Sequence, residues 1–221
     1  MPAQANVLAF RRRLLRWFRR HGRPLPWRAT RDPYRVLVAE FMLQQTQVPR
    51  VLQYYERFLR QYPSLETLAR AAPGTVREAW DGLGYYARAR NLRRLAQGIV
   101  KHHDGQVPAD PDVLVRLPGV GPYTAAAVAT FAYEHRVIPV DTNIARVLHR
   151  AFGVSRTRTR HLPGRVARLV DGLLPHDGKT TWALNQALMD LGAMVCTARK
   201  PRCRECPVRN ACMRKGVRGE E

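Results

Sequence analysis

The stretch LPGVGPYTAAAVA, residues 117–129, joins two apolar helical segments through a short turn rich in glycine. Gly119 and Gly121 allow the backbone to turn tightly and to come close to another molecule, because glycine has no Cβ. The amides before the second segment then point outward at the positive end of a helix, where an anion binds favourably. On its own, such a turn indicates no more than a reversal of the chain.

Helical periodicity extends on both sides of this turn over nearly all of the 221 residues. Apolar residues recur at helical spacing in ARNLRRLAQGIVKHH (89–103) and in WALNQALMDLGAMVC (182–196), and short proline- and glycine-containing breaks separate such segments. HRVIPV (135–140) fits a short strand and an extended loop equally well. The sequence therefore predicts an all-α protein built from many short helices.

The chain is strongly basic, with 38 Lys and Arg against 17 Asp and Glu and a net charge of +21. Such a surplus favours a polyanionic partner, nucleic acid first and an anionic membrane as the alternative. No apolar run is long enough to span a bilayer, and residues 1–22 lack the apolar core and cleavage site of a signal peptide. We expect a cytoplasmic, nucleoid-associated protein that binds no membrane, with the arginines of 11–20 in solvent and Leu14, Leu15, Trp17 and Phe18 packed inward.

All four cysteines lie near the end of the chain, with the spacing C-x6-C-x2-C-x5-C. An even number permits two disulfides, but clustered cysteines in a chain without an export signal favour metal. Four thiolates suit Zn²⁺ or an iron–sulfur cluster, and the residues alone do not choose between them. The ligands would be Cys196, Cys203, Cys206 and Cys212, in a loop whose main expected role is structural.

Glu40 is a lone carboxylate in the apolar run VLVAEFMLQQTQV, residues 36–48. Its neighbours one helical turn back are Val36 and Leu37, and one turn forward they are Leu43 and Gln44. An apolar setting makes ionisation costly, so we expect the pKa of Glu40 to be raised. By itself the stretch also fits a structural glutamate that is partly exposed or bonded to a backbone amide.

Together these features resemble the helix–hairpin–helix DNA glycosylases of the endonuclease III superfamily, and within it the MutY-type adenine glycosylases. The likeness covers about residues 7–214. It is carried, in the family's order, by LPWR (25–28), DPYRVLVAEFMLQQTQV (32–48), GLGYYARARNL (82–92), LPGVG (117–121), VDTNIARVL (140–148) and NQALMDLGAMVC (185–196).

The resemblance implies a fold with two helical domains. Residues 27–136 would form a six-helix barrel that contains the helix–hairpin–helix. Residues 1–26 and 137–221 would form the second domain, in which the loop 196–212 holds a [4Fe–4S] cluster. The active site is expected in the cleft between the two domains.

The resemblance also assigns catalytic roles. Glu40 would be the general acid that protonates the departing base, and Asp141 the ionised carboxylate that stabilises a cationic sugar, with Asn143 ordering the site. Asp141 also opens a predicted helix, so a capping role fits it as well. Bifunctional relatives have a lysine nucleophile where this chain has Tyr123, and no lysine lies between Lys101 and Lys179. Because tyrosine cannot form an imine, we expect hydrolysis without efficient strand cleavage.

DNA contacts are implied by the same resemblance. Gln45 would insert into the duplex once the base has flipped out, and Tyr85 would wedge beside the opposite base. The stretch GYYARAR (84–90) fits equally well a buried aromatic residue beside a solvated basic face. The full set of expected DNA contacts is Gln44, Gln45, Tyr85, Gly119, Val120, Gly121, Lys200 and Arg202. The expected base-pocket residues are Arg23, Leu25, Trp27 and Arg28.

The expected partner is duplex DNA with a mismatched or damaged base pair, bound by a monomer. The expected substrate is adenine opposite 8-oxoguanine or guanine. Full-length adenine enzymes read 8-oxoguanine with a further C-terminal domain, whereas this sequence ends at Glu221. Two alternatives stay open: a thymine or uracil glycosylase for G·T and G·U mismatches, and a non-catalytic DNA-binding or redox-sensing protein. The Glu40 and Asp141 carboxylates argue against the last, since neither would help to bind a polyanion.

Overall fold

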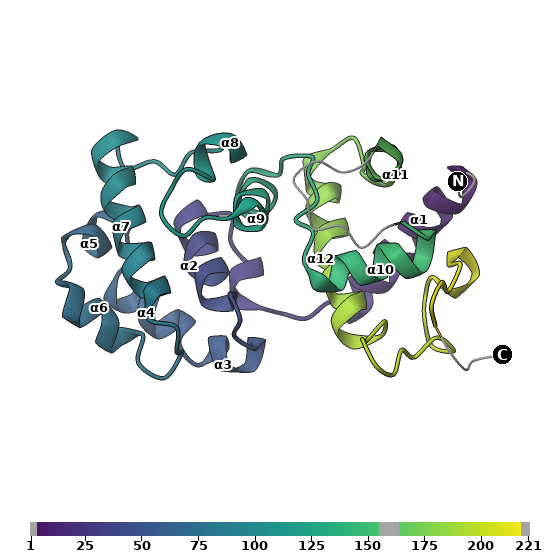
Figure 1. The fold of residues 1–221 in the computed structure, drawn as a ribbon, viewed down its shortest axis with the longest axis horizontal. Coiled ribbons are helices and arrows are strands. Elements are labelled where there is room, and N and C mark those ends of the chain that lie inside the picture. The colour runs from purple at the N-terminus through teal and green to yellow at the C-terminus, as the bar shows by residue number, and fades with distance from the viewer. Residues whose placement is uncertain (1–3, 155–163, 218–221) are drawn as a thin grey trace. The chain divides into compact units, whose positions relative to one another are not determined.

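The computed structural model describes residues 4–154 and 164–217, which form helices and connecting loops and contain no strand (Figure 1). The predicted all-α fold is confirmed. The segment HRVIPV is an extended loop that leads into a helix, so of its two possible interpretations the loop is correct.

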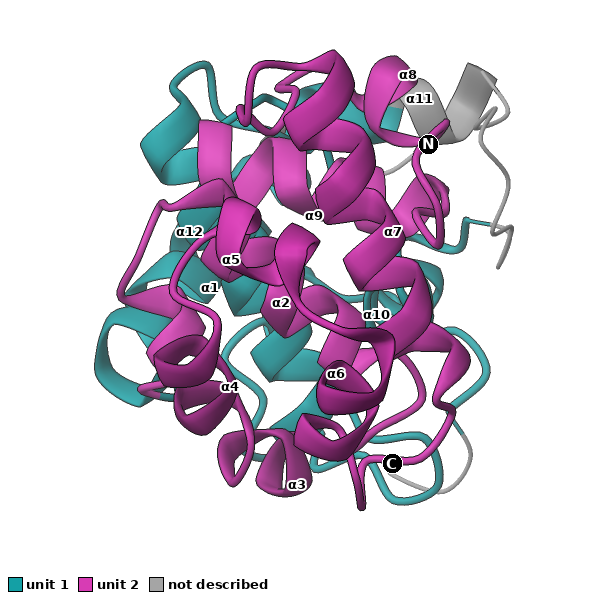
Figure 2. Cartoon of the chain, turned by 90° about the vertical axis from the view of Figure 1, so that its left-hand side faces the viewer, with its two compact units in different colours: residues 1–23, 134–221 teal, residues 24–133 magenta. Residues whose placement is uncertain are grey.

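The chain divides into two compact units (Figure 2). The central unit is the continuous segment 24–133, and the terminal unit combines residues 1–23 with 134–221. The helices of the central unit are η1 (Pro26–Arg28), α2 (Pro33–Leu43), α3 (Val48–Leu52), α4 (Tyr55–Gln61), α5 (Leu65–Arg70), α6 (Pro73–Ala79), α7 (Ala87–His102), α8 (Pro111–Leu114) and α9 (Pro122–Tyr133). Those of the terminal unit are α1 (Gln4–His21), α10 (Thr142–Phe152), α11 (Gly164–Leu173), α12 (Gly178–Met194) and η2 (Arg209–Ala211).

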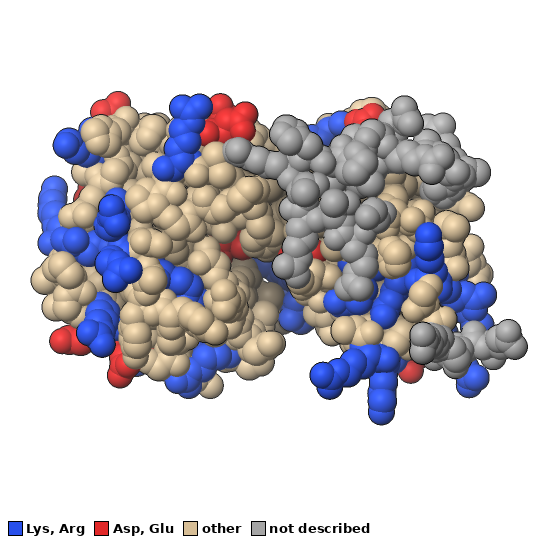
Figure 3. Space-filling model, viewed as in Figure 1, with Lys and Arg blue, Asp and Glu red and all other residues tan. Residues whose placement is uncertain are grey.

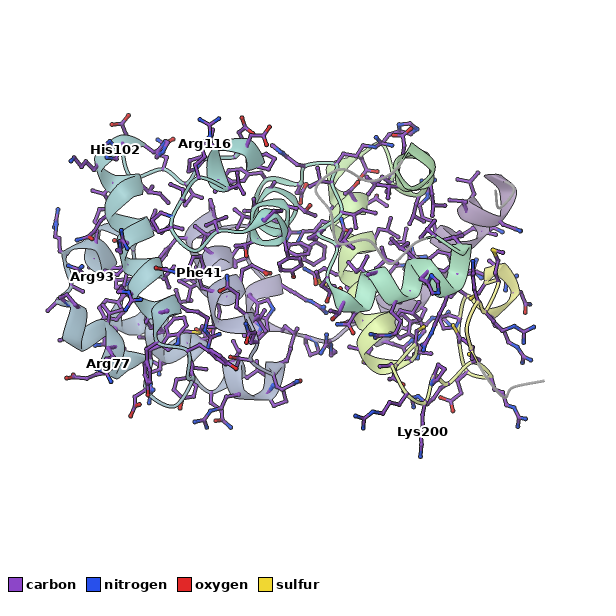
Figure 4. The ribbon with its side chains drawn as sticks, viewed as in Figure 1. Phe41, Arg77, Arg93, His102, Arg116 and Lys200 are labelled. Carbon is purple, nitrogen blue, oxygen red and sulfur yellow. The ribbon has the colours of Figure 1, made fainter. Side chains whose placement is uncertain are left out.

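Helix α2 forms the core of the central unit. Asp32 caps its N-terminus by accepting hydrogen bonds from the amides of Tyr34 and Arg35, and Pro33 occupies the first turn, where no amide is needed. Every residue from Val36 to Met42 is buried, because α2 packs against α9, α7, α4 and α3. Phe41 lies in the interior of this unit (Figure 4). A helix that is apolar on all sides has to be enclosed in this way.

Helix α12 forms the core of the terminal unit, where it packs against α1 and α10. Phe10 and Leu14 of α1 are fully buried, and the rings of Phe10 and Phe152 lie 4.8 Å apart. Leu15, Trp17 and Phe18 are partly buried against the same core, which confirms the predicted inward face of this helix. The chain leaves α10 through Gly153, whose φ of +70° is the left-handed conformation that ends many helices.

Basic side chains are spread over the surface, and they outnumber acidic ones on the face shown in Figure 3. None of the helices within 4–154 and 164–217 is both long and apolar enough to cross a bilayer.

Candidate active site

Glu40 lies in the middle of α2 and is only 5% exposed. Val36 and Leu37, one turn earlier, are buried with it, so the apolar setting expected from the sequence is confirmed. The short helix η1 packs against α2 and brings Leu25, Trp27 and Arg28 to the same side of the central unit. All three are buried, and the Trp27 ring meets the Tyr55 ring edge-on at 5.4 Å.

The glycine turn precedes α9, which packs against α2. Gly119 has a φ of +78°, and a Cβ there would lie 2.9 Å from both Phe41 Cε1 and Asn91 Cβ, so only glycine fits. Gly121 is different: its φ is not positive and a Cβ would meet nothing within 4 Å. The tight turn thus requires glycine at position 119, whereas the exposed Gly121 leaves room for the close approach of another molecule.

Two other residues expected to contact DNA are engaged within this turn. The amide of Val120 donates to the carbonyl of Leu117 at 3.1 Å, and its side chain is buried. Gln44 Nε2 donates to the Gly119 carbonyl at 3.3 Å and to Thr124 Oγ1 at 3.4 Å. Both residues therefore shape the turn, whereas Gly121 is exposed.

Tyr123 lies in the first turn of α9 and is half-buried. Because α9 packs directly against α2, Tyr123 is on the helix next to that of Glu40. Gln45 and Tyr85 occupy two exposed loops of the same unit, with positive φ angles of 57° and 48°. Non-glycine residues adopt this conformation only where their surroundings impose it.

Asp141 caps α10 in the terminal unit. Its Oδ1 accepts from the Ile144 amide at 2.7 Å, and its Oδ2 accepts from Asn143 Nδ2 at 3.0 Å. Both carboxylate oxygens thus accept hydrogen bonds from groups in the first turn of α10. The expected capping role is confirmed, and Asn143 orients the carboxylate as the sequence suggested.

Arg146, which the sequence did not single out, connects this pair to the cysteine loop. Its Nη2 donates to Asn143 Oδ1 and to the Gly192 carbonyl, both at 2.7 Å, and its Nε donates to the Cys196 carbonyl at 2.8 Å. The side chain is buried. Hydrogen bonds therefore run without interruption from Asp141 to the first cysteine.

The four cysteines line one largely apolar cavity of the terminal unit, together with side chains such as Phe10 and Val147. None of the four forms a disulfide. Burial, reinforced by the three other cysteines, raises the pKa of Cys206 to about 12. The four cysteines would therefore be ionised together in this cavity only if bound cations offset their negative charge. Arg150 Nη1 and the Arg214 amide each lie 3.4 Å from a cysteine sulfur, as donors to thiolates would.

Four thiolates form a donor set that suits either Zn²⁺ or an iron–sulfur cluster. Within the described ranges, no group of three or more His, Cys, Asp or Glu side chains is placed to hold one metal ion.

Three basic residues expected at the pocket or on DNA have different surroundings. Arg23 is held by Asp190, which is fully buried: Nε and Nη2 each lie 2.7 Å from Oδ1, and the Arg23 amide donates to Oδ2 at 2.9 Å. Arg202 pairs with Glu205 at 3.4 Å and also donates to the Met194 carbonyl. Lys200 projects away from the cysteine loop (Figure 4) and is available to a ligand.

Sequence reasoning missed Asp190, Arg146 and Arg88, all of them buried. Asp190 carries the signal that drew attention to Glu40, a single carboxylate inside an apolar helical run. The two arginines carry no such signal, because in a chain this basic they look like solvated residues.

This helical structure combines a glycine turn before a helix, a buried carboxylate and a four-cysteine loop. Together these features define a class of proteins. The chain belongs to the HhH-GPD superfamily of base excision DNA repair proteins, whose family model matches residues 38–171. It is 46% identical to the adenine DNA glycosylase of Mycobacterium tuberculosis over 88% of this chain, and 38% identical to the thymine-DNA glycosylase of Aeropyrum pernix over 95%.

The chain spans 64% of the length of the mycobacterial relative and 96% of that of the archaeal one. Among solved structures, a thermostable thymine-DNA glycosylase matches with a TM-score of 0.86 and 30% identity, over 96% of this chain and 97% of that one. The superfamily inferred from the sequence motifs is therefore confirmed.

Proposed function

We propose that the protein is a monofunctional DNA glycosylase that hydrolyses the N-glycosidic bond of adenine mispaired with 8-oxoguanine or guanine. The observation that carries this proposal is the burial of Glu40 inside α2, in a chain 46% identical to an adenine DNA glycosylase. Expelling adenine as an anion is slow, so the enzyme needs an acid that keeps its proton near neutral pH. An apolar helix interior provides such a setting.

Asp141 supplies the complementary charge. As the base leaves, the deoxyribose becomes cationic, and an ionised carboxylate stabilises it. The donors from Ile144 and Asn143 hold the Asp141 carboxylate in one orientation. Water then completes hydrolysis. Tyr123 contributes no amine, so no Schiff base forms and the DNA strand stays intact.

Duplex DNA is the partner, bound as a polyanion by a protein of charge +21. The Gly121 amide and Lys200 are suited to phosphate contacts, since one is exposed at the turn and the other projects from the cysteine loop. Gln45 and Tyr85 enter the stack and fill the space that a flipped base leaves.

A [4Fe–4S] cluster is held by Cys196, Cys203, Cys206 and Cys212 in this proposal. When bound, the cluster cross-links the loop 196–212 and fixes its shape, without taking part in hydrolysis. Hydrogen bonds from Arg150 and from the Arg214 amide stabilise the sulfur ligands.

Thymine or uracil opposite guanine is the second candidate substrate. It is favoured by the match to a thymine-DNA glycosylase over 96% of that relative's length. The proposed base-pocket residues Leu25, Trp27 and Arg28 lie in or directly before η1, which packs against α2, and contacts in such a pocket decide which base is accepted.

Excision assays distinguish these candidates. The protein is incubated with duplexes that carry A opposite 8-oxoguanine, A opposite G, T opposite G or U opposite G, and abasic sites are then cut with hot alkali. We expect cleavage of the adenine strand. If only the T or U strand were cleaved, the substrate would be thymine or uracil and not adenine. If no duplex were cleaved, the proposed glycosylase activity would be refuted.

Asp141→Asn tests the catalytic role against the capping role. Asp177 provides a matched control, because it caps α12 in the same way, accepting from the Thr180 amide at 2.7 Å. We expect Asp141→Asn to lose base release and keep DNA binding, while Asp177→Asn keeps both. Equal activity of the two variants would show that Asp141 is only a cap. A high yield of borohydride-trapped adduct would contradict monofunctional hydrolysis.

A further inference from the structure

Two exposed loops of the central unit carry residues in the left-handed conformation. Gln45 follows the end of α2, and Tyr85, with 63% of its surface exposed, precedes α7. Neither glutamine nor tyrosine favours a positive φ, and an exposed side chain gains nothing from packing that would impose it. Something in the interior must therefore hold each loop in place.

The buried Arg88 guanidinium holds both loops. Its Nη1 donates to the Gln44 carbonyl, immediately before Gln45, and to the Met42 carbonyl at 2.8 Å. Its Nη2 donates to the carbonyls of Gly84, immediately before Tyr85, and of Leu83, at 2.9 and 3.0 Å. Each strained residue is thus preceded by a peptide group that is bonded to the same side chain.

The guanidinium also supports the aromatic ring. Arg88 Cζ lies 5.6 Å from the centre of the Tyr85 ring and 5.4 Å from that of the buried Trp80. The cation therefore lies against both rings while its two terminal nitrogens bond the loops. Tyr85 is positioned through its backbone and its ring together.

Burial of the Arg88 guanidinium at the start of α7 costs free energy. Arg88 is only 7% exposed, and burial lowers the pKa of its guanidinium from the ordinary value. It also lies in the first turn of α7, where the helix dipole disfavours a cation. The carbonyls at the C-terminus of α2, which have no partner within their own helix, offset these costs. Lysine, a single point charge without a planar fork, could not span the two loops in the same way.

We propose that Arg88 is a positioning residue that sets Gln45 and Tyr85 as a pair before DNA arrives. The inference rests on the proposed function, in which these two side chains enter the duplex. Because one guanidinium bonds both loops, movement of either loop breaks its bonds to this side chain, and movement of the side chain releases both loops. Binding energy is then not used to order the loops and remains available for base flipping.

The test compares Arg88→Gln and Arg88→Lys with Arg93→Gln. Arg93 is the matched control: it lies on the same helix and donates to the Ala71 carbonyl at 2.6 Å, away from both loops. Amide hydrogen exchange is measured without DNA over residues 44–47 and 83–86. We expect exchange in Arg88→Gln to rise about tenfold or more in both stretches, since several charged hydrogen bonds are lost. Arg88→Lys should be intermediate and Arg93→Gln unchanged.

Base flipping is measured on the same variants by the fluorescence of 2-aminopurine placed next to the mispaired adenine, together with single-turnover excision. For Arg88→Gln we expect a smaller fluorescence rise and excision about tenfold slower or more, with affinity for duplex nearly unchanged. The same substitution made in a Gln45→Ala/Tyr85→Ala background should have little further effect.

Hydrogen exchange that rises in one loop only, or in neither, would overturn the proposal. So would an Arg88→Gln substitution that slowed excision by the same factor in the Gln45→Ala/Tyr85→Ala background as in the wild-type protein. The exchange readout needs no substrate. If the wild-type protein excised no base while Arg88→Gln still loosened both loops together, the proposed function would fail and the coupling of the loops would stand.

Discussion

Gly192→Ala tests how closely α12 must approach the residue that orients Asp141. A Cβ on Gly192 would lie 2.6 Å from Asn143 Cβ and 3.2 Å from Asn143 Cα. Carbon atoms in contact are normally about 3.5–4.0 Å apart, so the two helices would have to separate by about 1 Å. Neither atom belongs to the flexible end of a long side chain, and relief therefore requires backbone movement.

Two effects oppose each other in this variant. Alanine in place of glycine inside a helix contributes about 0.5–1 kcal/mol of stability. Overpacking costs about 1–3 kcal/mol, so we expect a net loss in the free energy of unfolding. A displacement of about 1 Å at Asn143 also disturbs the Asp141 carboxylate, and excision should slow on the order of 100-fold.

Urea unfolding and single-turnover excision measure the two consequences. Gly98→Ala in α7 is the control, since a Cβ there meets nothing within 4 Å, and it should be slightly more stable and equally active. A Gly192→Ala protein that matched this control in stability and rate would refute the idea that close helix packing holds the catalytic carboxylate in place.

Three further substitutions have defined outcomes. Glu40→Gln should slow excision by about 10²- to 10⁴-fold while gel-shift affinity for duplex DNA is kept, because it removes the acid and no phosphate contact; rapid excision would contradict the role of Glu40. Arg23→Ala should lower the free energy of unfolding by about 3–5 kcal/mol, because it removes the cation that pairs with the buried Asp190 carboxylate. The double variant Arg23→Ala/Asp190→Leu should recover part of this loss. If Arg23→Ala left the free energy of unfolding unchanged, the ion pair would contribute nothing to stability. Cys206→Ser should reduce visible absorbance and the unfolding temperature together, and unchanged spectra would argue against a cluster ligand at this position.

Local patterns were sufficient where the relevant chemistry is local. The burial of Glu40 follows from apolar neighbours at helical spacing, and the capping role of Asp141 follows from its place at the start of a periodic segment. The cysteine spacing indicated a metal-binding loop because it is a short-range feature. Each of these depends on residues within a few turns of one another.

Tertiary partners could not be predicted in the same way. For the stretch 84–90, one of the two interpretations left open was a buried aromatic residue beside a solvated basic face, yet Tyr85 and Tyr86 are exposed and Arg88 is buried. The reason is that Arg88 bonds carbonyls 44 to 47 residues earlier in the chain, which no local pattern reveals. Likewise, no local pattern indicated the bond between Arg23 and Asp190, because the two residues are 167 positions apart.

The division of the chain also sets an order of assembly during synthesis. Residues 24–133 are contiguous, so this unit can fold as soon as it leaves the ribosome, at about 5–20 residues per second. Helix α1 is made first but must wait with Phe10 and Leu14 uncovered until α12 is complete. The cysteine loop is synthesised after α1 and after the central unit, so a metal could bind at the proposed cysteine site only once the chain that forms the central unit has been made.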